Sequence, residues 1–169
     1  MTGGWDGYFR ESLPLSIVVN QPSDIARERA QERPFRPVVQ SAWIASAEET
    51  LEAARSGKAT VLDVRTRAEW EGVDTKGNRR GGHIPGATWL EHSMMSERGA
   101  PLPAAKLKER LHEAGVDESR PVITYCQGGI RAAQAALMLH ALGVPSVTNF
   151  DGSMGYYANQ TDLPLREDD

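Results

Sequence analysis

One stretch of the sequence decides the fold: Pro121-Val122-Ile123-Thr124-Tyr125-Cys126-Gln127-Gly128-Gly129-Ile130-Arg131. Its first five residues form a short apolar run, which is typical of a buried strand. The alanine- and leucine-rich residues 131–142 that follow predict a helix, and Gly143 is placed to end it. A buried strand that passes through a glycine-rich turn into a helix is typical of an α/β protein.

The rest of the chain repeats this alternation of strands and helices. Short apolar runs predict further strands at 59–64, at 146–150 and within 83–90. Helices are expected from the capping box of Ser46 and Glu49 to about Arg55, at 66–70, and from Pro103 onward. The predicted fold is therefore α/β, with a central parallel sheet and helices on both faces.

Residues 1–40 differ in composition from residues 41–169, which we predict to form one domain. Within residues 1–40, residues 20–37 are polar and charged and carry three prolines, so we interpret this stretch as an arm or linker with a short helix around Ile25–Ala30. Before it, residues 3–15 resemble residues 152–165 if one gap is allowed. Two interpretations stay open: a chance match, or residues 1–15 as the end of a preceding copy of the same domain.

Composition excludes several classes of partner. The net charge of −4 argues against nucleic acid, and no apolar run approaches the roughly 18 residues that cross a bilayer. The N-terminus lacks the features of a signal peptide, and the single cysteine can form neither an internal disulfide nor a cysteine-rich zinc site. We therefore expect a cytoplasmic protein in a reducing setting, without a membrane partner, a metal or a cofactor.

Cys126 lies where a parallel sheet presents its C-terminal edge, the usual place for a ligand in α/β proteins. Gly128 and Gly129 allow the backbone to bend tightly and to point several N–H groups inward, which favours a bound anion. Arg131 adds a permanent positive charge at the end of the loop. We expect the thiol to ionise readily and to act as a nucleophile; the alternative is a small buried side chain without a chemical role.

At these residues the sequence resembles the rhodanese family, and four motifs in the family's order carry the resemblance. They are Leu62-Asp63-Val64-Arg65 with Glu69-Trp70, Gly82-His83-Ile84-Pro85-Gly86-Ala87, the loop Cys126 to Arg131, and Asp151-Gly152-Ser153 with Leu163-Pro164-Leu165. The long loop 71–80 and the possible copy at the start look most like the second domain of a tandem sulfurtransferase. The resemblance covers residues from about 41 to 166.

The resemblance implies a sulfurtransferase in which Cys126 accepts sulfur as a persulfide. The donor, thiosulfate or a persulfide, would bind to the loop, and a small thiol, cyanide or a partner protein would accept the sulfur. Asp63 is expected to brace the neighbouring loops; Arg65 either attracts the anionic donor or forms a structural salt bridge. His83 is expected to be a neutral histidine bonded to a backbone carbonyl rather than a base. The donor-binding residues implied are Gln127, Gly128, Gly129, Ile130, Arg131 and Arg65.

Three alternatives bear on this function. The loop interior is uncharged from Gln127 to Ile130, which puts a preference for thiosulfate in doubt. Cysteine phosphatases and arsenate reductases place five residues between the cysteine and the arginine of their loop, whereas four separate Cys126 from Arg131 here. The shorter loop encloses a smaller space, which suits a sulfur atom better than a phosphate group. A persulfide carrier, a sulfur sensor or an interaction domain without turnover also stays open.

Overall fold

The computed structural model describes residues 40–166. The expected arm helix at 25–30 and the possible copy at 1–15 lie outside this range. The described residues contain a four-stranded sheet in the order β2-β1-β5-β6, and all of its strands are parallel. The strands are β1 (Thr60–Asp63), β2 (Thr88–Trp89), β5 (Val122–Tyr125) and β6 (Val147–Asn149). The predicted parallel sheet is confirmed.

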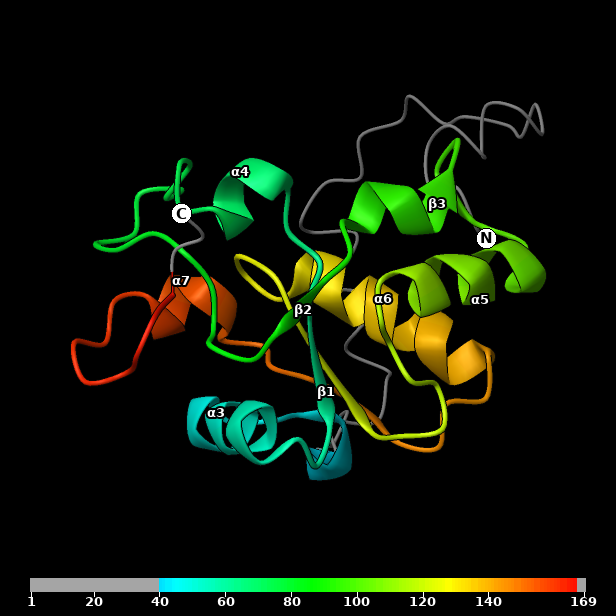
Figure 1. The fold of residues 1–169 in the computed structure, drawn as a ribbon, viewed down its shortest axis with the longest axis horizontal. Helices are drawn as coiled ribbons and strands as arrows, with labels where there is room; N and C mark the ends of the chain where they lie inside the picture. Colours follow the sequence, from blue (N-terminus) through cyan, green and yellow to red (C-terminus); the bar gives the residue numbers. More distant parts are fainter. Residues whose placement is uncertain (1–39, 167–169) are drawn as a thin grey trace, which may run out of the picture.

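Helices cover both faces of this sheet, as expected. Figure 1 shows α3 and α7 on one side of the strands and α5 and α6 on the other. The helices are α3 (Ala47–Ser56), α4 (Arg67–Trp70), α5 (Ala104–Glu113), α6 (Ile130–Ala141) and α7 (Ser153–Tyr157), with 3-10 turns at Ser41–Trp43 and His92–Met95. A two-stranded antiparallel ribbon, β3 (Ser96–Glu97) with β4 (Ala100–Pro101), lies outside the main sheet.

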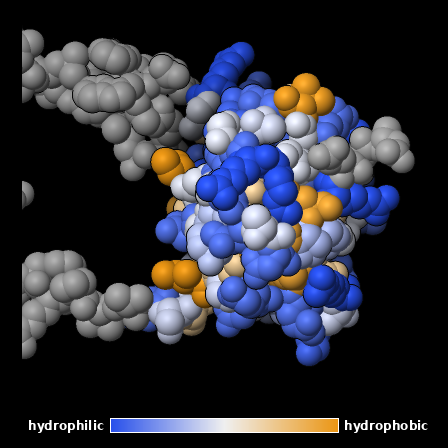
Figure 2. Space-filling model, turned by 90° about the vertical axis from the view of Figure 1, so that its left-hand side faces the viewer, coloured by the Kyte–Doolittle hydropathy of each residue, from blue (hydrophilic) through white to orange (hydrophobic). Residues whose placement is uncertain are grey.

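The face that carries α4 and α7 is largely hydrophilic, and its apolar residues occur in separate spots (Figure 2). Within residues 40–166, no helix has the length and apolar character needed to cross a membrane.

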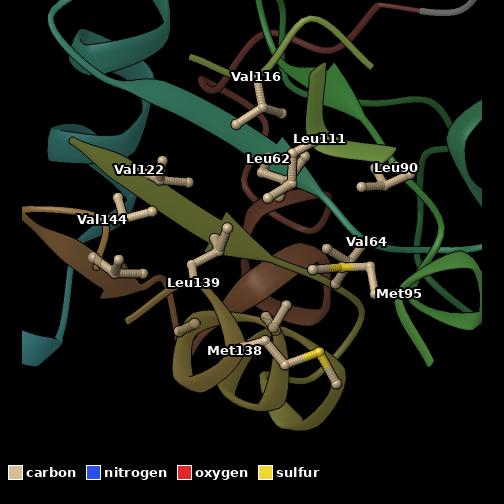
Figure 3. Close-up of a cluster of buried hydrophobic side chains, with 14 of the residues drawn as sticks. Leu62, Val64, Leu90, Met95, Leu111, Val116, Val122, Met138, Leu139 and Val144 are labelled. Atoms are coloured by element: carbon tan, nitrogen blue, oxygen red, sulfur yellow. The ribbon is translucent and has the colours of Figure 1, made fainter. Parts of the chain in front are cut away.

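The core has two parts because successive residues of a strand point to opposite faces of the sheet. Leu62 and Val122 belong to the cluster that includes Leu111 of α5 and Leu139 of α6 (Figure 3). Their neighbours Val61 and Ile123 belong to the other cluster, with residues of α3 and α7. Strands buried on both faces explain why the sequence shows apolar runs rather than strict alternation.

The first predicted helix begins and ends as expected. Ser46 accepts a hydrogen bond from the Glu49 amide and Glu49 reaches back to the Ser46 amide, so the capping box is complete. Gly57 ends the helix with φ of 64°, a left-handed conformation that glycine adopts without strain.

Candidate active site

Cys126 directly follows the central strand β5, and its side chain is buried. Its amide donates to Ser153 Oγ at 3.1 Å, and its carbonyl accepts from the Met154 amide at 3.0 Å. The next carbonyl, of Gln127, accepts from the Gly155 amide at 2.7 Å. Three hydrogen bonds therefore fasten the start of the loop to α7, a helix that the sequence did not predict.

The two glycines of the loop differ in what surrounds them. Gly129 has φ of 83°, and a Cβ placed there would lie 2.6 Å from Asp151 Oδ1 and 2.8 Å from the Asp151 carbonyl oxygen. A Cβ at Gly128 would meet nothing within 4 Å. The close approach of loop and Asp151 thus depends on Gly129 in particular.

The amides of the loop are main-chain donors of the site that lack an acceptor among the described residues. Within residues 40–166, the main-chain N–H groups of residues 127–131 donate to no acceptor, and the start of α6 has no side-chain cap. Five successive N–H groups without partners, at the positive end of a helix, favour an anion beside them. This is the arrangement that the glycine-rich turn predicts.

Arg131 forms an ion pair that the sequence analysis missed. Its guanidinium donates to both carboxylate oxygens of Glu69 in α4, at 2.8 and 2.7 Å. The Glu69 side chain has 0 % exposure and that of Arg131 has 31 %. Burial by itself raises the pKa of Glu69, but hydrogen bonds from Arg131 and Thr66 outweigh it and lower the pKa to about 2.

Arg131 also interacts with the cysteine. The hydrogen bonds and charge of Glu69 raise the pKa of Arg131 above its ordinary value, and Cys126 adds to the increase. The Arg131 guanidinium therefore interacts electrostatically with both Glu69 and Cys126. The local signal for this pair was the Thr66-x-x-Glu69 capping box, which places Glu69 but does not reveal its partner.

Asp63 and Arg65 form a buried ion pair with 0 % and 3 % exposed side chains. Arg65 donates to Asp63 through Nε and Nη2, and its Nη2 also donates to the carbonyl of Gly82 at 2.9 Å. Burial and the neighbouring Asp63 raise the pKa of Tyr125 well above its ordinary value. Two roles were left open for Arg65, and its geometry is that of the structural salt bridge. Through the hydrogen bond to Gly82, Arg65 also links the end of β1 to loop 71–82.

The side chain of Gln127 is held by the loop that precedes β2. Its amide exchanges two hydrogen bonds with the amide of Asn78, at 3.1 and 3.2 Å, and Asn159 donates to the same Asn78 oxygen. The sequence could not predict this contact, because Asn78 and Gln127 are polar loop residues 49 positions apart. It joins the rim of the active loop to a segment expected to be only a surface loop.

Arg80 lies next to the exposed Arg79 in a polar loop, but its own side chain is engaged within the protein. Its guanidinium donates to the carbonyls of Tyr157, Ala158, Gln160 and Leu163 and fastens the segment after α7. The Arg79 side chain is exposed.

His83 lies as expected for a structural residue. Its ring stacks on Trp70 with centroids 3.5 Å apart, and its Nδ1 lies 3.1 Å from the Trp70 carbonyl oxygen. Since a carbonyl only accepts, Nδ1 carries the proton in this contact. Among residues 40–166, no three His, Cys, Asp or Glu side chains gather as metal ligands.

Comparison with known proteins places this arrangement in a family. The rhodanese-like domain matches residues 46–160. The chain belongs to the rhodanese family. It is 33 % identical, over 98 % of its length, to the thiosulfate sulfurtransferase of Corynebacterium glutamicum, of which it covers 56 %. It is 30 % identical, over 90 % of its length, to human 3-mercaptopyruvate sulfurtransferase, of which it covers 50 %.

Among solved structures, this rhodanese domain resembles the Tum1 protein of Saccharomyces cerevisiae with a TM-score of 0.65 and 25 % identity. The match covers 76 % of this chain and 47 % of that one. The chain thus spans about half the length of the curated relatives it matches. The rhodanese match includes both the loop at Cys126 and the Glu69 that pairs with Arg131.

Proposed function

We propose that this rhodanese domain is a sulfurtransferase that carries sulfane sulfur as a persulfide on Cys126. One observation carries the proposal: the only cysteine of the chain is followed by five amides, of residues 127–131, that have no acceptor within the described residues. Such amides stabilise negative charge on a sulfur anion without rearrangement. The relatives named as sulfurtransferases are consistent with this chemistry.

The reaction would proceed in two displacements. In the first, the Cys126 thiolate attacks the outer sulfur of the donor; an Sγ–S bond forms, the S–S bond of the donor breaks, and the leaving group departs with its electron pair. In the second, an acceptor nucleophile attacks the outer sulfur of the persulfide and Cys126 leaves as a thiolate. No cofactor is needed because neither step is a net oxidation.

The donor and the acceptor in this proposal are small molecules, with a partner protein as a further possible acceptor. Residues 127–131 would hold the donor through their backbone, because the Ile130 side chain is exposed and the Gln127 amide is engaged by Asn78. Asp63 and Arg65 would brace the loops rather than bind the donor, since their side chains are buried against each other. The reducing, cytoplasmic setting inferred from the sequence suits a lone thiol.

The test is intact-mass analysis of the purified full chain after exposure to a sulfane-sulfur donor. We expect a gain of one sulfur, about 32 mass units, that cyanide or a reducing thiol removes. Cys126→Ser is the matched control and should show no gain. If no donor gives a cyanide-labile adduct on Cys126, the proposal is wrong. An adduct that no acceptor turns over would instead indicate a persulfide carrier.

A further inference from the structure

The positive charge at the end of the active loop is already paired with a buried carboxylate. Both Glu69 oxygens accept from Arg131, and Oε2 also accepts from the amide and hydroxyl of Thr66, at 3.1 and 2.9 Å. With a pKa of about 2, Glu69 is ionised at every physiological pH. Arg131 therefore contributes orientation to the site but little uncompensated charge.

Three other cations along the first strand, α4 and the loop after it are likewise paired with carboxylates. With Arg131 and Glu69 included, the part of the chain that the structure describes has four ion pairs here: Arg131 with Glu69, Arg65 with Asp63, Arg67 with Glu71, and Lys76 with Asp74. Arg80 is bound to main-chain carbonyls, and Arg79 is exposed to solvent, where its charge is screened. Each of the four paired cations thus has its own carboxylate.

Charge balance then sets which donor the site accepts. At the loop itself the charges of Arg131 and Glu69 cancel, so the Cys126 thiolate of the proposed reaction leaves one net negative charge there before any donor binds. Thiosulfate brings two further negative charges, whereas a thiol persulfide group brings at most one. Backbone amides carry only partial charges, so they can compensate the smaller excess but not the larger.

We infer that Glu69 makes the site select thiol persulfides over thiosulfate as sulfur donors; this rests on the proposed function of Cys126. Glu69 does not touch the donor and acts through Arg131, so it is a positioning residue that determines specificity. In the favoured reaction the Cys126 thiolate attacks the outer sulfur of R–S–SH. The new bond is Sγ–S, the bond that breaks is the donor S–S bond, and R–S⁻ leaves with the electron pair and takes up the proton.

The test compares rate constants for persulfide formation on Cys126, followed by intact mass, with cysteine persulfide and with thiosulfate. Glu69→Gln keeps the size and the hydrogen-bonding amide but removes the charge that balances Arg131. We expect the rate constant with thiosulfate to rise about tenfold and that with cysteine persulfide to change less than about threefold. Glu113→Gln is the matched control, because it changes net charge equally at an exposed pair with Arg110 and should alter neither rate constant.

A second measurement needs no variant at the site. If the wild-type site repels a dianion, raising ionic strength from about 0.01 to 0.1 M should increase the rate constant with thiosulfate. An unchanged donor ratio in Glu69→Gln, or a wild-type thiosulfate rate constant that falls with salt, would overturn the inference. Neither result would contradict the proposed function, because that proposal is wrong only if no donor forms a persulfide on Cys126.

Discussion

The two consecutive glycines of the active loop, Gly128 and Gly129, have different surroundings and therefore different structural roles. Gly129 has a positive φ and lies against Asp151, while Gly128 faces open space and its φ lies outside the left-handed region. Sequence alone treats the two as equivalent sources of flexibility. In the structure only Gly129 permits the close contact, which lies just before α7 and its hydrogen bonds to the start of the loop.

We therefore predict different outcomes for alanine at these two positions. Gly129→Ala places a Cβ in a left-handed conformation and 2.6 Å from Asp151 Oδ1, so we expect a loss of about 2 kcal/mol or more in the free energy of unfolding. Persulfide formation should slow as the loop shifts. Gly128→Ala should change stability by less than about 0.5 kcal/mol. Urea unfolding of both variants and the rate of mass gain on Cys126 check this, and equal losses would contradict it.

At the scale of elements, the short helix α4 has two functions. Its capping box with Thr66 uses the same Glu69 carboxylate that holds Arg131 at the start of α6. A four-residue helix is too short to be stable by itself, so its position depends on such tertiary contacts. The ion pair between Glu69 and Arg131 thus connects the short helix α4 to α6, the helix that directly follows the active loop.

The pH dependence of stability tests this link. The pKa of Glu69 falls from an ordinary 4.5 to about 2 on folding, so its contribution is complete above about pH 4.5 and is lost as the pH falls toward 2. We expect the wild-type chain to be more stable than Glu69→Gln at pH 6 and the difference to shrink between pH 4.5 and 2. Urea unfolding over this range measures it, with Glu113→Gln as the control for an exposed carboxylate. A difference that does not depend on pH would show that the pair contributes nothing.

Elements with local signals were predictable from sequence, and those that depend on distant partners were not. Apolar runs located the strands, and capping residues such as Ser46 and Gly57 located helix ends, because both signals act within a few residues. Helix α7 was missed because its short glycine-containing sequence is stabilised by the active loop. The contacts of Glu69 with Arg131 and of Asn78 with Gln127 join residues 62 and 49 positions apart, beyond the reach of spacing arguments.

In the whole molecule, the active loop is held by contacts from almost the full length of the described domain. Glu69 of α4, Asn78 of the following loop and Ser153 of α7 reach it from different directions. These residues lie within 41–169, the range that we propose as one domain. Among residues 40–166, the contacts that hold the loop thus all come from within the range 41–166.

This leads to a prediction for a chain that begins at residue 41. Because the loop contacts at Glu69, Asn78, Asp151 and Ser153 all stay in the shortened chain, we expect it to unfold in one cooperative transition and to form the Cys126 persulfide at the rate of the full chain. Thermal unfolding and the rate of mass gain measure the two parts. A cooperative fold with a much slower rate would assign residues 1–40 to the donor site. Loss of cooperative unfolding would instead assign them to the core, and the domain boundary would then lie before residue 41.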